Sequence, residues 1–409
     1  DSIHLSEKHL KIALETSRKI GDPYTEINSE LTLSYLFLKT NNLTEASNYL
    51  SKARSFASVY GLEYELVECD LLNGELETAR NNFEGITDSF KKALVRAQAM
   101  NEFNLMIEAN YKLAVVYDKY NLKELAESYY SSAVKLVEDH SRSLFEDDEV
   151  QISYFSAKHN IYYSFAEFYL KNNQYKNAFE LIEKSRSRNT MQNLSNLKLQ
   201  SAIKDEVTLK SIYEYDWMIH SGLYEQNKLD SLKTLFTELK NGIIDDDPSM
   251  NKYLNFESGI SIIEIQKNLE GNENIVSIFS IEEKTYVFVL SENGFDHFEL
   301  DVTKKELKNL TASISPYYDP KNSSNNSYYN QDLFSFNVEA AFNFYTKIIK
   351  PFINKIPEGE KIIFTSSYEL ETFPFEFLVT DFNKDQSSFN YGEQKYLLFR
   401  NNISYSPSA

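Results

Sequence analysis

The chain is poor in the residues that interrupt helices and in cysteine. Its 409 residues include 11 glycines, 8 prolines and one cysteine. So few glycines and prolines leave little punctuation, which favours long helices. The single cysteine, Cys69, excludes a disulfide and a multi-cysteine metal site within this chain. It agrees with a reducing compartment, and we therefore expect the cytoplasm. A disulfide-free periplasmic protein would have the same composition.

Positive charge and long apolar runs are also scarce. Lysine and arginine total 42 against 61 aspartates and glutamates, which gives a net charge of −19. A chain this acidic offers no general surface to a phosphate backbone, so we expect no direct binding to nucleic acid. No run approaches the ~18 apolar residues of a membrane helix, so we expect no membrane segment. The chain also lacks a glycine-rich phosphate loop and a histidine pair at metal-ligand spacing, and we expect no cofactor and no metal.

What the sequence does contain is an internal repeat with a period of 40 residues. Four positions recur in each repeat, and we call each recurring position a column. Two columns form the main contact: small residues at Ala13, Ala53, Ala93 and Ala133, and large apolar residues at Leu10, Leu50, Phe90 and Tyr130. The other two are a second set of small residues at Ser34, Gly74 and Ala114, and helix-ending residues at Gly21, Gly61, Asn101 and Ser141. A small residue lets a neighbouring helix approach, and a bulky one fills the adjoining gap. The pattern predicts paired helices that stack on one another, because one pair cannot bury its apolar face alone.

These columns resemble the tetratricopeptide repeat. Ala114, Tyr117, Ala126, Tyr130 and Ala133 follow the signature of that family in order. The period of 40 is longer than the usual ~34 and is similar to the variant with longer helices. The resemblance implies an α-solenoid over residues 1–198, with a further unit displaced by extra residues in a loop around 146–149. Its first unit has only a second helix, at 4–20, so we expect the chain to be a fragment of a longer protein.

In this family the first helix of each pair lines the concave face, and partners bind there. Carried over position by position, the resemblance implies a partner-binding face made of Asn28, Leu31, Tyr35, Leu38, Glu68, Leu71, Glu75, Glu108, Tyr111, Asp118, Asn160, Tyr163 and Glu167. The Lys and Asn that clamp a peptide carboxylate in some members are missing. A face of Tyr with Glu suits an apolar or basic peptide instead. The alternative is that Tyr35 and Tyr111 are packing residues, and Cys69 in the same layer is expected to be a small core residue.

Periodicity changes towards the C-terminus. Residues 199–259 keep helical spacing and predict a helical linker, with a loop at 245–248. From 260 onwards, β-branched and aromatic runs alternate with helical segments, which predicts an α/β domain over 260–409. The expected strands are 275–281, 285–290, 295–300 and 361–365, with a hairpin at Asn293-Gly294; the expected helices are 261–269, 304–313 and 335–350; and a long loop is expected at 317–330.

This second region resembles the N-terminal part of the CHAT domain, a caspase-like cysteine peptidase module. The residues that carry the resemblance are Ile348–Phe352, Pro374-Phe375-Glu376 with Leu378, and Ile403–Ala409. The tandem order of tetratricopeptide repeats followed by CHAT adds to it. One departure stands at 366–368, where the chain has Ser-Ser-Tyr in place of the family's common Pro-Asp-Gly.

The resemblance implies a catalytic thiol and histidine that come after the last matched segment. All six histidines precede that segment: His4, His9, His140, His159, His220 and His297. Cys69 belongs to the repeat region, and His297 is expected to be structural within its strand. We therefore assign no catalytic residue and expect this chain alone to be inactive. Arg186 and Arg188 are interpreted as a solvated charged face.

The leading hypothesis is the N-terminal part of a signalling protease, a caspase-like cysteine endopeptidase that is regulated when its solenoid binds a protein, peptide or ribonucleoprotein partner. The alternative is a non-catalytic repeat scaffold with a degenerate CHAT domain, for which the altered turn at 366–368 is the motive. A third hypothesis, a repeat-bearing regulator such as a kinase sensor, predicts a coiled coil or an ATP-binding segment, and the sequence contains neither.

Overall fold

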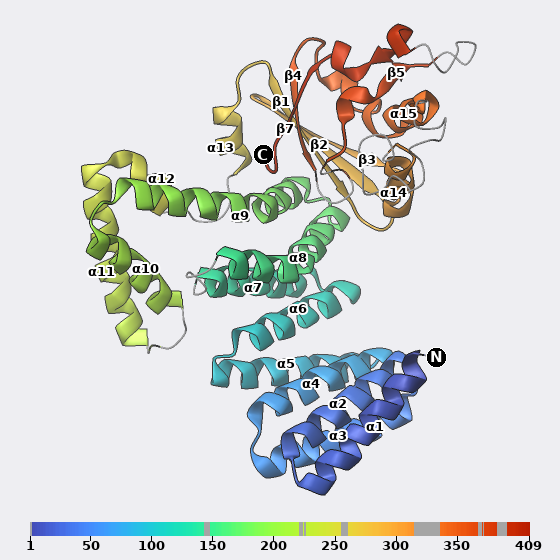
Figure 1. Ribbon diagram of the computed structural model, residues 1–409, viewed down its shortest axis with the longest axis vertical. Coiled ribbons are helices and arrows are strands. Elements are labelled where there is room, and N and C mark those ends of the chain that lie inside the picture. Colours follow the sequence, from blue (N-terminus) through green and yellow to red (C-terminus); the bar gives the residue numbers. More distant parts are fainter. Residues whose placement is uncertain are drawn as a thin grey trace, which may run out of the picture. The chain divides into compact units, whose positions relative to one another are not determined.

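The structure is a computed structural model that describes residues 2–142, 148–220, 224, 226–254, 261–314, 336–366, 370, 372–382 and 391–409. The loop expected at 317–330, the turn at 367–368 and positions 146–147 lie outside these ranges. The chain divides into two compact units (Figure 1). The first comprises residues 1–165 and 195–256, and the second comprises 166–194 and 257–409.

The first unit begins with a regular succession of helices. They are α1 (Ser2–Ile20), α2 (Pro23–Lys39), α3 (Leu43–Tyr60), α4 (Glu63–Ala79), α5 (Phe83–Met100), α6 (Phe103–Lys119) and α7 (Lys123–Arg142). Each packs against the next, and α2 also packs against α4. Figure 1 shows them following one another from blue to cyan, joined by short turns. The predicted helical region is therefore confirmed in its coarse form.

The turns between these helices use a left-handed backbone. Gly21, Gly61 and Asn101 have φ of 69°, 65° and 58°, as expected of residues that end a helix. Ser141, the fourth member of that column, is buried and is the last residue but one of α7, which runs to Arg142, so it does not lie past the helix as expected. A second set of turns was missed: Asn41, Asn81 and Asn121 also adopt positive φ. Their own 40-residue spacing was a usable signal in the sequence, because asparagine tolerates this conformation.

The small and large columns of the repeat meet in the core. Ala53 and Ala93 are fully buried, and Leu50 and Phe90 are 3% and 1% exposed. Gly74 in α4 lies against Phe90 in α5 so closely that an added Cβ would stand 2.3 Å from Cε1 of the ring. Ser34, the residue equivalent to Gly74 in the preceding pair, donates a hydrogen bond to the carbonyl of Ala46 at 2.7 Å. The expected interlocking of small and bulky side chains is confirmed at these positions.

Longer helices follow. They are α8 (Asp148–Lys171), α9 (Tyr175–Ala202), α10 (Glu206–His220), α11 (Gln226–Asp246) and α12 (Asn251–Leu254). Within the first unit, α10 packs against α7 and α11. The loop expected at 245–248 is shorter than expected, because α11 continues through Asp246. Asp247 ends it by accepting a hydrogen bond from the Ser249 amide at 2.9 Å, which starts a 3₁₀ turn at Pro248.

The second unit contains a five-stranded mixed sheet in the order β3-β2-β1-β4-β7. Its strands are β1 (Glu273–Ser280), β2 (Thr285–Ser291), β3 (Gly294–Leu300), β4 (Lys361–Ser366) and β7 (Asn402–Tyr405). β1, β2 and β3 form an antiparallel meander, whereas β4 is parallel to both β1 and β7. The four predicted strands and the hairpin at Asn293-Gly294 are confirmed. A separate pair, β5 (Val379–Asp381) and β6 (Lys395–Tyr396), was not predicted.

Helices cover both faces of this sheet. On one face, Val276, Ile278 and Phe364 pack against α14 (Lys304–Ala312) and α15 (Val338–Phe344), which continues as a π-turn at Tyr345–Ile349. Figure 1 shows α14 and α15 together on that side. On the other face, Phe179 of α9 meets Phe288 and Phe295, with ring centroids 5.6 and 5.5 Å apart. The short helix α13 (Ile262–Asn268) precedes β1 and begins with a capping box at Ser261 and Glu264.

The sheet therefore includes part of the repeat region among its packing partners. Residues 166–194 group with the sheet, whereas the sequence places a boundary at 198. The reason is that Phe179 and its neighbours on α9 cover a sheet face that would otherwise be exposed. Within the described ranges, no helix is both long enough and apolar enough to cross a membrane.

Candidate functional site

A groove of about 490 Å³ lies in the first unit, across α2, α4 and α6. Its lining residues are Asn28, Leu31, Thr32, Tyr35, Tyr64, Glu68, Leu71, Leu72, Glu75, Asn104, Leu105, Glu108 and Lys158. We call it the Glu68 groove. Leu31, Leu71 and Leu105 are buried and contribute apolar surface, whereas Tyr35 and Tyr64 are each 46% exposed. The groove thus combines an apolar floor with aromatic and acidic walls.

The structure brings together seven of the residues expected on the partner-binding face. They are Asn28, Leu31, Tyr35, Glu68, Leu71, Glu75 and Glu108. Each sits on the same face of its helix because residues three or four apart lie one above the other. The alternative that Tyr35 is a packing residue is not supported by its 46% exposure.

The other expected residues are not among the groove's lining. Leu38 packs against the core of the first helices, and the Tyr111 hydroxyl lies 3.0 Å from the Ser164 hydroxyl. Tyr163 packs against His159, Asn160 is exposed, and Asp118 is half-buried near the end of α6. Glu167 belongs to the second unit and pairs with Lys171 at 2.7 Å.

Six lining residues were missed: Thr32, Tyr64, Leu72, Asn104, Leu105 and Lys158. Tyr64 and Asn104 lie one turn before Glu68 and Glu108, so extending each helix face by four residues would have found them. Lys158 comes from α8, and no spacing within the repeats points to it. Helix periodicity was therefore the signal that could have identified Tyr64 and Asn104, but the predicted face began one turn too late on each helix.

Negative charge accumulates in the groove. Burial raises the pKa of the Glu68 carboxyl, and the nearby carboxylates of Glu65 and Glu108 raise it further. Burial also raises the pKa of the Tyr64 hydroxyl, to which Glu68 and Glu108 contribute again. Burial is the larger cause of both shifts, and the smaller contribution of the neighbouring carboxylates reports a negative local potential. The groove would therefore favour a positively charged group.

Two lysines moderate this potential without cancelling it. Lys112 is bonded to Glu75, which neutralises that carboxylate. Lys158 lies on the groove wall, and burial lowers the pKa of its amine, although attraction to Glu108 opposes the shift. Among the described residues, neither Glu68 nor Glu108 has an ion-pair partner within 4 Å. Glu68 thus remains available to a ligand, whereas Glu108 is also attracted to Lys112 and Lys158 without an ion pair to either.

Besides Glu68, the first unit contains another carboxyl group whose pKa is raised by burial: Glu30, on α2. Glu30 is fully buried and accepts a hydrogen bond from Arg18 at 2.8 Å through Oε1. Its Oε2 atom has no hydrogen-bond partner in the described part of the chain. Burial raises the pKa of Glu30 to about 7, although Arg18 acts in the opposite direction.

This carboxyl should make stability depend on pH. Because its pKa is higher in the folded chain than in the unfolded one, its stabilising contribution is complete below pH ~4.5 and is lost as pH rises through about 7. We expect Glu30→Gln to become more stable relative to the parent by about 2–3 kcal/mol between pH 5 and pH 8.5. Urea unfolding followed by the fluorescence of Trp217, the single tryptophan, measures this difference. The exposed residue Glu15 supplies the control, because Glu15→Gln should show a flat difference. A flat difference for Glu30→Gln would contradict the assignment.

The second unit holds a buried ion pair on the sheet face covered by α9. Glu183 and Arg186 lie 2.6 Å apart, with side chains only 4% and 6% exposed. Arg186 Nη1 donates to the Ser277 hydroxyl at 2.8 Å, and Nη2 donates to the Ile278 carbonyl at 2.9 Å. Glu183 accepts from the hydroxyls of Ser277 and Thr365 at 2.7 and 3.1 Å, and from the Ala409 amide at 2.7 Å. The interpretation of Arg186 as a solvated residue was therefore wrong.

No described cysteine or histidine forms a catalytic arrangement. Cys69 is fully buried, and burial raises the pKa of its thiol to about 12, so it is a core residue as expected and a poor nucleophile. His297 stacks on Tyr175 with ring centroids 3.7 Å apart, which agrees with a structural role. Within the described ranges, no group of three or more His, Cys, Asp or Glu side chains is arranged to hold a metal ion.

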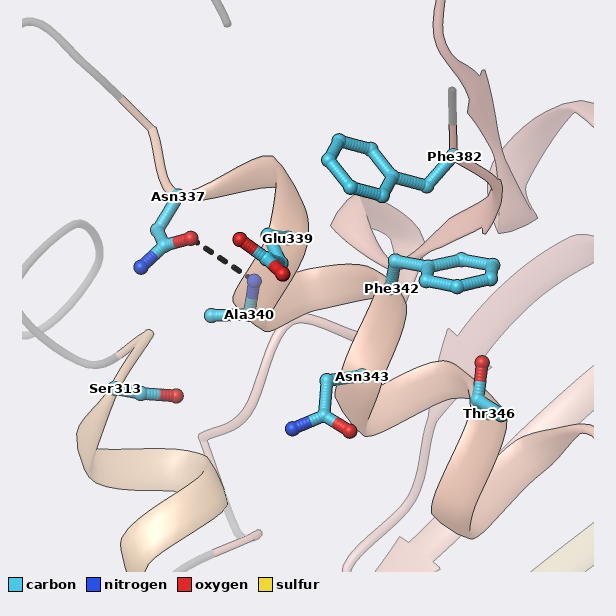
Figure 2. A pocket seen from close by; sticks show the side chains of 8 residues that line it. All are labelled: Ser313, Asn337, Glu339, Ala340, Phe342, Asn343, Thr346 and Phe382. Atoms are coloured by element: carbon cyan, nitrogen blue, oxygen red, sulfur yellow. Dashed lines mark hydrogen bonds between the residues drawn. The ribbon is translucent and has the colours of Figure 1, made fainter. Parts of the chain in front are cut away.

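A second hollow, of about 540 Å³, lies in the second unit (Figure 2). Its walls are Ser313, Asn337, Glu339, Ala340, Phe342, Asn343, Thr346 and Phe382. The rings of Phe342 and Phe382 stand 5.7 Å apart, and Asn337 caps α15 by accepting from the Ala340 amide at 2.9 Å. Glu339 is the one titratable residue among these eight, so the hollow offers no acid–base pair. The Glu68 groove is the better candidate for a functional site.

No protein-family model matches the chain, and no curated protein matches it either. The fold and the geometry of the groove are therefore the observations on which a functional assignment depends.

Proposed function

We propose that this chain is the N-terminal part of a caspase-like cysteine endopeptidase of the CHAT type, whose tetratricopeptide-type solenoid binds a protein or ribonucleoprotein partner. Binding would regulate the protease. The chain itself would carry the receiving surface and the first strands of the protease domain, and it would be catalytically inactive.

The observation that carries this proposal is the meeting of two segments on which the CHAT resemblance rests. The backbone amide of Phe375 donates a hydrogen bond to the Tyr405 hydroxyl at 2.8 Å, and that hydroxyl in turn donates to the Glu376 carboxylate. Phe375 also stacks on Phe364 of β4, with ring centroids 3.9 Å apart. Residues that the resemblance selects, 30 positions apart in the sequence, are thus hydrogen-bonded to one another, and Phe375 packs on an interior strand of the sheet. The two matched segments therefore contribute to one core, as two segments of a single domain would.

The open edge of the sheet gives further support. No described strand pairs with the outer edge of β7. Leu398 and Phe399, in the 3₁₀ turn that packs against β7, are 43% and 71% exposed. An unpaired edge beside exposed apolar side chains is where a further strand of a caspase-like sheet would add.

The partner-binding role is supported by the Glu68 groove. Seven residues selected by the tetratricopeptide resemblance line one hollow, and the exposed Tyr35 and Tyr64 belong to a residue type that is enriched at interfaces. A groove of this composition is suited to protein recognition, and it contains neither a histidine nor an accessible thiol, the two groups that cysteine-peptidase chemistry needs.

Extending the chain tests the enzymatic part of the proposal. We expect this 409-residue chain to generate no new protein N-termini in an extract of its source cells, which would supply the partner. A longer product of the same gene that includes the next ~150 residues, the remainder of a domain of typical size, should generate them. Quantitative mass spectrometry of N-termini is the measurement.

Two variants of the longer product make the test specific. Replacing the cysteine of the added segment with alanine should abolish cleavage, whereas Cys69→Ser should leave it unchanged because the Cys69 thiol is buried. Cleavage that survives the first replacement, or an added segment without cysteine and histidine, would overturn the protease assignment and favour a scaffold.

A further inference from the structure

On the basis of the proposed role of the first unit in binding a protein, we propose that the Glu68 groove binds an extended segment of the partner that places a lysine or arginine side chain between Glu68 and Glu108 and apolar side chains on the leucine floor. This inference specifies the chemistry of the partner, which the repeat resemblance leaves open.

The charge of the groove selects the cation. Glu68 and Glu108 have no ion-pair partner among the described residues, whereas the neighbouring Glu75 is already bonded to Lys112. A carboxylate held partly out of water beside another one is relieved when a cation enters between them. The chain as a whole carries a net charge of −19, which would also speed the approach of a basic segment.

The aromatic walls favour the same group. Tyr35 and Tyr64 line the same groove as the two carboxylates, and their half-exposed rings are open to contact with an entering lysine or arginine. The Tyr35 ring already accepts a cation, because Lys39 Nζ lies 4.9 Å from its centroid. A cation is attracted both to the face of a tyrosine ring and to a carboxylate, whereas an anion is attracted to neither.

The floor and the length of the groove indicate a polypeptide. Leu31, Leu71 and Leu105 are 8%, 7% and 5% exposed and come from α2, α4 and α6. Crossing three helices spaced roughly 9 Å apart covers about 18 Å, which matches five or six extended residues. A free metal ion would leave this apolar surface uncovered, and a polyamine would have no side chain to place on it.

The experiment uses fluorescence anisotropy with this 409-residue chain and a fluorescein-labelled octapeptide of alternating leucine and lysine or arginine. Two peptides of the same length carry glutamine or glutamate at the basic positions. We expect the basic peptide to bind, and to bind about tenfold or more tightly than the glutamine peptide. Raising the salt concentration should weaken its binding, because the charges lie near solvent.

Matched variants separate the groove from the general acidity of the chain. Glu68→Gln combined with Glu108→Gln should weaken binding of the basic peptide about tenfold or more. Glu15→Gln combined with Glu84→Gln removes the same charge at exposed positions outside the groove and should leave the affinity unchanged. Circular dichroism checks that both double variants are folded. Equal weakening by the two double variants would overturn the proposal.

Spermine tests the choice of a polypeptide. It should displace the basic peptide only at concentrations well above the peptide's own dissociation constant. Spermine that binds as tightly as the peptide, with the same dependence on Glu68 and Glu108, would overturn the proposal in favour of a polyamine site. Preferential binding of the glutamate peptide would overturn it as well. Neither result affects the protease assignment, which is read from cleavage by the longer gene product.

Discussion

Replacing Arg186 with methionine is expected to destabilise the sheet unit by about 3–5 kcal/mol. The variant leaves the Glu183 carboxylate buried without its cation, and the remaining donors from Ser277, Thr365 and Ala409 do not neutralise the charge. It also leaves the Ile278 carbonyl without the Arg186 donor. Native-state hydrogen exchange at the amides of β1 and β4 measures the loss locally, so the result does not depend on the other unit.

Two further variants test the cause. Lys176→Met removes a positive charge from an exposed position on the same helix, and it should change exchange in the sheet by less than about 0.5 kcal/mol. Adding Glu183→Gln to Arg186→Met should recover part of the lost stability, because a buried amide costs less than a buried unpaired carboxylate. If the sheet amides exchange at the same rates in Arg186→Met as in Lys176→Met, the ion pair does not stabilise the sheet.

This ion pair also shows where sequence reasoning stops. The strands at 275–281 and 361–365 were predictable because β-branched and aromatic residues fill them. Nothing in the spacing of Glu183 and Arg186 indicated burial, since an i, i+3 pair of opposite charge is equally common on a solvated helix face. Only the packing of α9 against Ser277 and Thr365, some 90 and 180 residues away in sequence, reveals that both side chains are enclosed.

The candidate site was predictable to a similar extent. Positions on one helix face follow from periodicity, and Leu31, Leu71 and Glu75 were placed correctly for that reason. Lys158 could not be found, because it comes from α8 and reaches the groove through tertiary packing. Tyr111 and Tyr163 were expected in the face, yet each packs against a neighbouring side chain instead. The face pattern does not show how far along each helix the groove extends.

The contact of Gly74 with Phe90 allows a test of the repeat packing, because Gly74→Ala should change stability in opposite directions with and without the Phe90 ring. Phe90→Ala should cost about 3–5 kcal/mol, because the ring is 1% exposed and leaves a cavity. In the parent chain, Gly74→Ala should also destabilise, by about 1–2 kcal/mol: the new methyl would overlap the Phe90 ring at 2.3 Å, and this outweighs the better helix propensity of alanine. Urea unfolding followed by Trp217 fluorescence measures both.

In the Phe90→Ala background, the same Gly74→Ala change should instead stabilise the chain by about 1 kcal/mol, because the methyl enters the vacated space and alanine favours the helix. Gly242 in α11 is the matched control, since nothing lies within 4 Å of its added Cβ. Gly242→Ala should stabilise by a similar amount in both backgrounds. If Gly74→Ala has the same sign with and without the Phe90 ring, the small and large columns of the 40-residue repeat do not interlock as the structure indicates.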